Sequence, residues 1–151
     1  MKKGFTLIET VIVLFVMCLA VGAVLFGTSG LLARNKIDEA QEQIVSLLKD
    51  ARDKTLARDG GAAYGVHLQT TQAIFFRGPT YSAGAASNTA YVLPSDIQIS
   101  SYALTGGGAD VIFTALTGET RNDGTIRLQK VGSSTINRTI RIYASGTIKP
   151  E

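Results

Sequence analysis

Apolar residues dominate the beginning of the chain, where no charged residue occurs from Thr10 to Ala33. At a rise of about 1.5 Å per residue, a helix over these 24 residues is roughly 36 Å long. The hydrocarbon core of a bilayer is ~30 Å thick. The pattern therefore predicts a helix that is long enough to cross a membrane.

The spacing of apolar residues changes to steps of three and four after Arg34, which is typical of an amphipathic helix. The apolar positions are Ile37, Ala40, Ile44, Leu47, Leu48, Ala51, Thr55 and Leu56. No proline or glycine interrupts Leu31 to Asp59, and Asp59-Gly60-Gly61 is a typical helix stop. We therefore expect the apolar half of the helix, residues 5–33, to continue into an amphipathic half, residues 34–59.

From residue 60 to residue 151 the apolar residues alternate with polar ones, which predicts short strands. The expected strands are Ala63 to Gln69, Gln72 to Arg77, Ala90 to Leu93, Ile97 to Ser101, Asp110 to Thr114, Thr125 to Lys130, Arg138 to Ala144 and Thr147 to Lys149. Thr70-Thr71 and Asn122-Asp123-Gly124 are predicted hairpin turns, the second because Asn, Asp and Gly tolerate positive backbone angles. The predicted class is α+β, with a long helix packed on a mostly antiparallel head.

Three charged residues near the amino end change this picture. Lys2 and Lys3 precede the apolar run, and the positive-inside rule then predicts that the amino end stays in the cytoplasm. Glu9 lies at the start of the run. A charge at the centre of a membrane costs ~2.5–3.5 kcal/mol on insertion scales, so we interpret Glu9 as a functional residue.

Two processing sites are compatible with such a start. An ordinary secretory signal would be cleaved after its apolar core, near the small residues that precede Ala33. Cleavage between Gly4 and Phe5 would instead leave the apolar helix on the mature protein. The length of the run and the acidic residue at its start favour the second site.

The stretch Lys2-Lys3-Gly4-Phe5-Thr6-Leu7-Ile8-Glu9 resembles the class III leader junction of type IV pilins and type II secretion pseudopilins. This resemblance implies that residues 1–4 are a leader, which a prepilin peptidase removes after Gly4, and that the new amino group of Phe5 is methylated. It also implies that Glu9 guides assembly with other pilin or pseudopilin subunits at an inner-membrane assembly platform. The chain would first be a single-pass protein of the bacterial inner membrane with its head on the periplasmic side, and then part of an extracytoplasmic filament.

A role for Glu9 also follows from helix geometry. After cleavage, the amino group of Phe5 and the carboxylate of Glu9 would be four residues apart, on one face and near the positive end of the helix dipole. In a filament, Glu9 could instead reach the amine of a neighbouring subunit. The plainer alternative is a carboxylate that lies at the headgroup boundary.

The head carries a weaker resemblance. The segments Gly118 to Thr125 and Ser145 to Lys149, together with Leu47 to Arg58 at the end of the helix, look like those of GspH/FimT-like minor pseudopilins and minor pilins. This resemblance implies a type IV pilin-like fold and a structural, non-enzymatic subunit. It leaves open whether the machine is a type II secretion, pilus or competence system, and whether the subunit is major or minor.

Candidate catalytic and metal-binding residues are sparse. The chain has one cysteine, Cys18, and one histidine, His67, which we expect on the outer face of its strand. Asp110, Glu119 and Asp123 could meet around a calcium ion, but their spacing does not resemble an EF-hand. A strand cap for Asp110 and a turn for Asp123 are the favoured interpretations, and we expect neither a metal nor a cofactor.

The carboxyl-terminal strands are rich in cations. If the strands around Arg127 and Arg141 pair, these side chains share an exposed face, and Lys149 follows near the end. FimT-like minor pilins that bind DNA use a basic motif near this position, so a DNA-binding face is one interpretation; an ordinary solvated face is the favoured one. Global charge adds little, because the net charge falls from +3 to +1 without Lys2 and Lys3.

Overall fold

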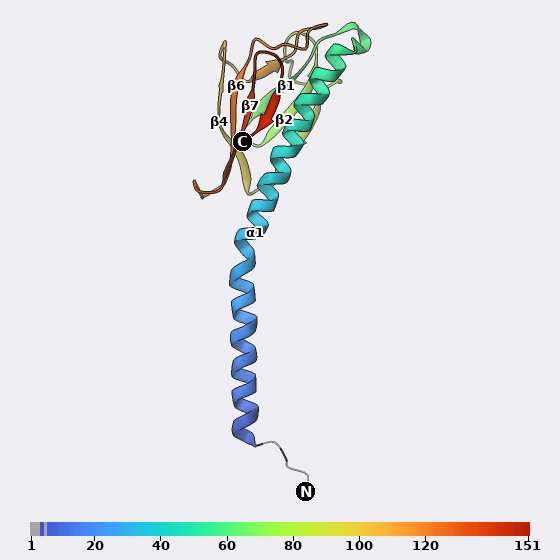
Figure 1. Ribbon diagram of the computed structural model, residues 1–151. Coiled ribbons are helices and arrows are strands. Elements are labelled where there is room, and N and C mark those ends of the chain that lie inside the picture. Colours follow the sequence, from blue (N-terminus) through green and yellow to red (C-terminus); the bar gives the residue numbers. More distant parts are fainter. Residues whose placement is uncertain (1–3, 5) are drawn as a thin grey trace. The chain divides into compact units, whose positions relative to one another are not determined.

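The computed structural model describes residue 4 and residues 6–151; for residues 23–33 it describes the backbone alone. Helix α1 covers Leu7–Leu56, and eight strands follow it (Figure 1). By internal contacts the chain divides into two units, Met1–Arg34 and Asn35–Glu151. The predicted leader, residues 1–4, lies outside the described residues except for Gly4, which is exposed.

The core of the second unit is built on one stripe of α1. Ile37, Ala40, Ile44, Leu48 and Ala51 have no exposed surface. They pack against buried side chains of both sheets, including Val66, Val111, Ile126, Leu128 and Ile140. The predicted amphipathic stripe is therefore the face that forms the core.

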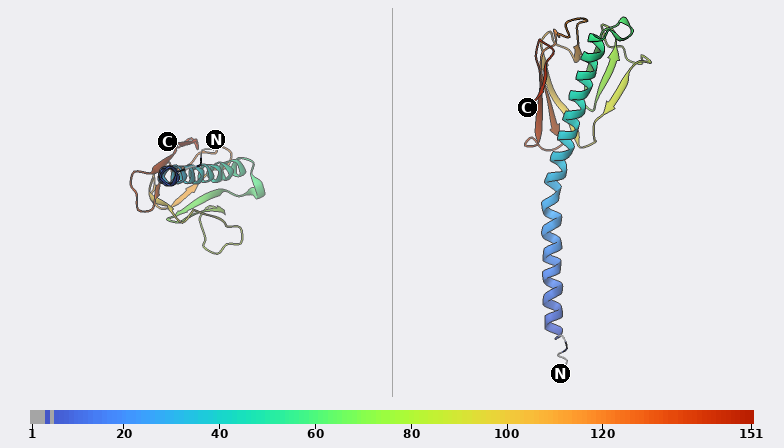
Figure 2. Two further views of the ribbon diagram at one scale, coloured as in Figure 1. Left: turned by 90° about the horizontal axis from the view of Figure 1, so that it is seen from below. Right: turned by 45° about the vertical axis from the view of Figure 1, so that its right-hand side comes forward.

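The strands form two antiparallel sheets that flank this part of α1 (Figure 2). The first sheet has the order β3-β2-β1-β5, and the second has the order β4-β6-β7-β8. Their bounds are β1 Tyr64–Gln69, β2 Gln72–Arg77, β3 Thr89–Val92, β4 Ile97–Leu104, β5 Asp110–Ile112, β6 Gly124–Lys130, β7 Asn137–Ile142 and β8 Ile148–Pro150. The predicted α+β class with a helix on antiparallel strands is confirmed.

The junction between α1 and β1 is a buried hydrogen-bonded link. Thr55 has no exposed surface, and its hydroxyl donates to the carbonyl of Ala51 at 2.7 Å. The same hydroxyl accepts from the backbone N–H of Tyr64 at 2.9 Å. This threonine, predicted on the apolar stripe, ties the end of the helix to the first strand.

The end of α1 differs from the expectation. The helix ends at Leu56, and the first left-handed residue after it is Arg58, with a φ of 52°. Asp59–Gly61 then form one turn of 3₁₀ helix, with Gly60 and Gly61 also at positive φ. The left-handed backbone after the helix therefore begins at Arg58, before the glycines. The usual preference for glycine at a helix end did not predict this.

One of the two predicted hairpins is wrong. Thr70-Thr71 does join β1 to β2, where Gln69 pairs with Gln72. The segment Asn122-Asp123-Gly124, in contrast, leads into β6, which pairs with β4 and β7. The N–H of Thr105 donates to the carbonyl of Asp123 at 2.7 Å, so Asp123 continues the pairing of β4 with β6 beyond Leu104 and Gly124. The chain bends at Arg121, one residue before the predicted turn, and the predicted turn residues lead into β6.

Two glycines allow two loops to touch beside α1. Gly146 has a φ of +76°, and a Cβ there would overlap the carbonyl oxygen of Gly118. Gly118 has a φ of +65° and lies against Arg52 and Leu56 of α1. The turn before β8 and the loop after β5 therefore depend on a contact that only glycine at position 146 permits.

We predict that Gly146→Ala lowers the free energy of unfolding by about 3 kcal/mol, because it adds backbone strain and a steric overlap. Gly107 is the matched control, since it has a similar φ of +71° but nothing within 4 Å of an added Cβ. Gly107→Ala should cost about 1 kcal/mol, the strain alone. Denaturant unfolding measures both, and equal losses would contradict the predicted contact.

Candidate functional site

The first turn of α1 is capped by Thr6. The N–H of Glu9 donates to the Thr6 hydroxyl at 3.3 Å, and Thr10 donates to the Thr6 carbonyl from its N–H and from its hydroxyl, both at 3.2 Å. The Glu9 side chain is exposed, in the first turn of the helix. Phe5 lies outside the described residues, so the predicted pairing of its amine with Glu9 stays a prediction.

Sequence analysis missed the role of Thr6, although a signal was present. A threonine followed three residues later by a glutamate, before an apolar run, is the sequence pattern of a capping box. The carboxylate of Glu9 therefore has a local stabilising position near the positive end of the helix dipole, in addition to any contact with another subunit.

The apolar part of α1 is exposed where its side chains are described. Leu7, Ile8, Phe15, Met17 and Leu19 are each between 59% and 82% exposed. Within the described residues, no helix combines the length and the apolar character that a membrane crossing requires. The predicted span from Thr10 to Ala33 runs into residues 23–33, whose side chains are outside the description, and stays a prediction.

We predict that Thr6→Ala frays the first turn of α1, because the Glu9 N–H loses its side-chain acceptor. A cap contributes about 1 kcal/mol, so amide exchange of Glu9 in detergent micelles should become roughly fivefold faster. Thr6→Ser keeps the hydroxyl and should exchange like the parent chain. Equal exchange in all three chains would show that Thr6 is not the cap.

The basic residues of the carboxyl-terminal strands lie as their alternation predicted. β6 and β7 pair with Arg127 opposite Thr139 and Thr125 opposite Arg141, and β8 places Lys149 opposite Arg141. Since Ile126, Leu128, Ile140 and Ile142 are buried, Arg127, Arg141 and Lys149 point away from the core, and all three are exposed. The structure therefore brings the three predicted residues onto one face.

That face is not purely cationic. Nε of Arg141 donates to the Glu151 carboxylate at 2.8 Å, with both side chains 45% exposed. The ammonium of Lys149 lies 5.7 Å from the centre of the Tyr143 ring. Arg127 makes no ion pair among the described residues.

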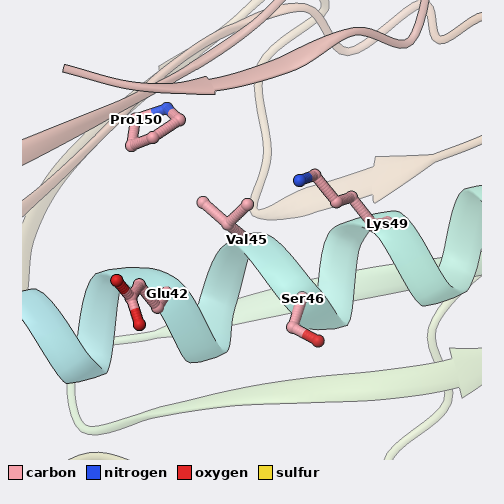
Figure 3. A pocket seen from close by; sticks show the side chains of 5 residues that line it. All are labelled: Glu42, Val45, Ser46, Lys49 and Pro150. Carbon is pink, nitrogen blue, oxygen red and sulfur yellow. The ribbon is translucent and has the colours of Figure 1, made fainter.

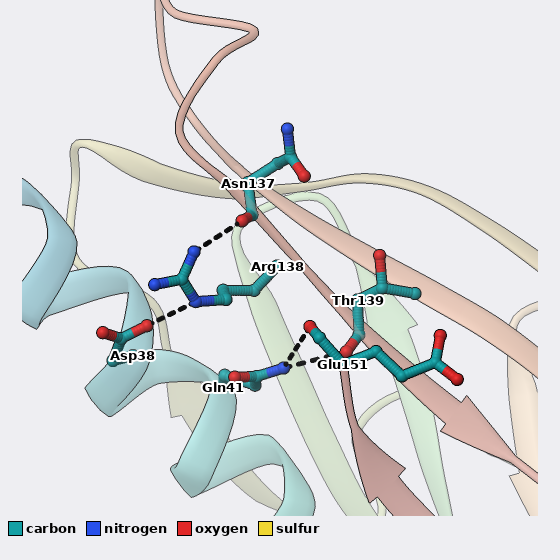
Figure 4. A network of polar contacts seen from close by, with 6 residues as sticks. All are labelled: Asp38, Gln41, Asn137, Arg138, Thr139 and Glu151. Atoms are coloured by element: carbon teal, nitrogen blue, oxygen red, sulfur yellow. Dashed lines mark hydrogen bonds and ion pairs between the residues drawn. The ribbon is translucent and has the colours of Figure 1, made fainter.

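Another cation of this region, Arg138, points toward α1 instead. Its Nε donates to Asp38 at 2.6 Å, and Gln41 donates to the carbonyls of Thr139 at 2.8 Å and Glu151 at 3.4 Å (Figure 4). Gln41 is only 7% exposed. These contacts fasten the ends of β7 and β8 to the helix and remove Arg138 from the exposed basic face.

An apolar groove lies between α1 and β8. Its volume is about 310 Å³, and its lining residues are Glu42, Val45, Ser46, Lys49 and Pro150. Val45 points toward Pro150 across the groove, while Glu42 and Lys49 lie on either side of Val45 along the helix (Figure 3). β8 pairs with β7 only, and Pro150 has no N–H to offer at the free edge. The groove is therefore better suited to a side chain than to an added strand.

His67 lies on the sheet face opposite α1, as predicted, but a loop covers it. Its Nδ1 is 2.5 Å from a carboxylate oxygen of Asp110, and its ring stacks on Tyr81 with the centroids 3.9 Å apart. Phe76 packs edge-on against Tyr81. The histidine therefore helps to fasten the segment between β2 and β3 to the first sheet.

The three acids considered for calcium are not brought together. Asp110 pairs with His67, Glu119 is exposed in the loop after β5, and the backbone carbonyl of Asp123 accepts a hydrogen bond from the N–H of Thr105. Among the described residues, no group of three or more His, Cys, Asp or Glu side chains could hold a metal ion.

Tyr91 of β3 has a shifted pKa. Burial, and then the nearby Glu39 carboxylate of α1, raise the pKa of this phenol.

The amino-terminal segment of the chain matches a known family model. Residues 1–25 match a family model described as the prokaryotic N-terminal methylation motif. No curated protein matches the chain in sequence. The resemblance of the amino terminus to prepilin-type leaders is therefore confirmed by an independent match.

Solved structures of two proteins are similar in fold. The type IV minor pilin FimU of Pseudomonas aeruginosa has a TM-score of 0.59 at 16% identity, covering 78% of this chain and 90% of that chain. The minor pseudopilin EpsH from the type II secretion system of Vibrio cholerae has a TM-score of 0.58 at 12% identity, covering 78% and 94%. The predicted type IV pilin-like fold is confirmed, and the narrower likeness to GspH/FimT-like proteins stays a prediction.

Proposed function

We propose that this chain is a structural subunit of a type IV pilin-like filament, of the type II secretion or type IV pilus class. The observation that carries this proposal is the methylation motif over residues 1–25, followed in one chain by a head with the fold of minor pilins and pseudopilins. A leader-type cleavage site and an exposed apolar helix are what such a subunit needs.

The proposed mechanism is assembly. A prepilin peptidase cuts after Gly4 and methylates Phe5, and the subunit waits in the inner membrane with its head on the outer side. An assembly platform then transfers the apolar half of α1 from lipid into a bundle of neighbouring helices, which are about as apolar as the lipid that they replace. Glu9 compensates the amine of an adjacent subunit, so that the acid sets the register between chains.

We predict that the mature chain begins at N-methylated Phe5, which mass spectrometry of the amino-terminal peptide measures directly. An amino terminus near Arg34 would instead identify an ordinary secretory signal and end this proposal. Gly4→Leu should block processing, because the peptidase of this class reads a glycine at the cleavage site.

We predict that Glu9→Val lowers recovery of the chain in sheared filaments at least tenfold, because the neighbouring amine loses its counter-charge in a low-dielectric bundle. Glu39→Val removes an exposed carboxylate from the same helix and serves as the matched control. Membrane levels of both variants are measured in parallel. Incorporation of Glu9→Val at the level of the parent chain would contradict the role of Glu9.

A second candidate function is DNA capture on the same scaffold, favoured by the shared face of Arg127, Arg141 and Lys149. Duplex DNA binding should then weaken steeply with salt, and Arg127→Ala should reduce the slope of that dependence by about one. Glu151→Gln should strengthen binding, because it frees Arg141. If DNA binding does not respond to salt, to Arg127→Ala or to Glu151→Gln, the face is an ordinary solvated surface.

A further inference from the structure

One end of the second unit is the end at which α1 enters it. In the first turn of this part of α1, the ammonium of Lys36 donates to the Asp96 carboxylate at 3.2 Å. The N–H of Val131 donates to the backbone carbonyl of Asp96 at 2.9 Å. Val131 follows β6 directly, so it begins the turn to β7. The tip of this hairpin, residues 131–136, therefore lies at the entry end of the head, which we call the basal end.

The basal end carries more bases than acids. Its bases are Lys36, Lys130 and Arg138, and its acids are Asp38 and Asp96. Lys36 and Arg138 pair with these acids, whereas Lys130, the last residue of β6, makes no ion pair among the described residues. Glu39, the next acid along α1, lies instead near Tyr91 of the first sheet. One cation of the basal end is therefore left without a counter-charge.

The hairpin itself contains no acid. From Gly124 to Pro150 the sequence has neither Asp nor Glu. At the tip, the side chain of Val131 is 49% exposed, and Ser134 and Thr135 are exposed as well. The tip therefore presents an apolar side chain and hydroxyl groups to its surroundings, and no negative charge.

The height of the basal end above a membrane follows from the helix. The predicted membrane run ends at Ala33, and α1 continues to Lys36 three residues later, a rise of about 4.5 Å. The headgroup region on each side of a bilayer is about 5–7 Å thick. A run of roughly 36 Å also exceeds a hydrocarbon core of ~30 Å, and tilt of the helix accommodates the excess and lowers one side of the head. With the run in a membrane, Lys36 and the residues that it contacts therefore lie at the level of the headgroups.

We propose that the basal end of the head, at Lys36, Lys130 and the hairpin tip, lies on anionic phospholipid headgroups while the subunit waits in the membrane. The inference rests on the proposed filament function and adds a stage to it, in which the lipid surface orients the head before transfer. The two ammonium groups attract lipid phosphates, the hydroxyls of the tip donate to phosphate oxygens, and Val131 enters the apolar boundary.

A weak contact is sufficient for this role. One exposed valine and two cations bind a membrane only weakly when they must find it from solution. The apolar run holds them beside the surface, so that the contact forms within one molecule at a high effective concentration. Transfer into a filament breaks the contact, and a weak contact adds little to the work of extraction.

The first test measures how close the hairpin tip lies to lipid in vesicles of equal parts phosphatidylcholine and phosphatidylglycerol. The full chain carries Cys18→Ser and a fluorophore on Ser134→Cys, and lipids with spin-labelled headgroups quench the fluorophore. Ser145→Cys is the matched control, because its turn lies beside Gly118 and is tied to α1 at Arg52, about 24 Å along the helix from the basal end. Quenching at residue 134 should be at least threefold stronger than at residue 145. Equal quenching overturns the proposal.

Charge reversal separates binding to anionic lipid from mere closeness to the membrane. Lys130→Glu should lower the quenching at residue 134 at least twofold in the mixed vesicles and have little effect in phosphatidylcholine alone. Lys149→Glu removes an exposed cation from the outer face of the same sheet and should change neither. High salt should weaken the quenching without any change at position 130. Quenching in the mixed vesicles that is insensitive to Lys130→Glu or to salt overturns the proposal.

The native thiol distinguishes failure of this proposal from failure of the filament function. Cys18 is exposed on the apolar part of α1, so a fluorophore on it is quenched by lipids with spin-labelled acyl chains when the run is in the bilayer. Strong quenching at Cys18 with equal quenching at residues 134 and 145 overturns the contact of the head and leaves the filament function standing. Weak quenching at Cys18 overturns the membrane stage, and both proposals with it.

Discussion

Burial of one stripe of α1 against two sheets is the constraint on which the head depends. Ile37, Ile44 and Leu48 are completely buried, and each such side chain contributes roughly 1.5–3 kcal/mol. The ion pairs Lys36–Asp96, Arg138–Asp38 and Arg141–Glu151 are all partly exposed, and pairs of this kind contribute at most about 1 kcal/mol. Packing of the helix therefore holds the head together, while the polar contacts decide how the strand ends are fastened to it.

The same helix carries two different surfaces along one chain. In the second unit the apolar stripe of the helix is buried against the two sheets, whereas Leu7, Ile8 and Phe15 of the first unit are exposed. An exposed apolar surface of this extent marks a place where lipid or protein is to be bound. This difference follows from the spacing of apolar residues along the helix. A stripe of apolar residues packs on one core, whereas a helix that is apolar on all sides requires partners all around it.

The sequence was informative wherever a local pattern decides the outcome. Alternation placed Arg127 and Arg141 on one exposed face, and the spacing of Ile37, Ile44 and Leu48 identified the core stripe. It failed where the outcome depends on distant segments: Asn122-Asp123-Gly124 was predicted to close a hairpin, but it leads into β6, whose partners β4 and β7 are set by the packing of the sheet. The closeness of Gly118 to Gly146 could not be predicted, since it leaves no mark in composition or periodicity.

Pro150 has a consequence that reaches beyond its own strand. β8 is the edge of its sheet, and exposed edges of neighbouring molecules tend to zip together when they are crowded. A filament would hold many heads at a very high local concentration, in which continuous pairing between edges would lock them irreversibly. Pro150 has no N–H with which to continue that pairing, so the free edge of β8 is a poor template for a strand of a neighbouring head.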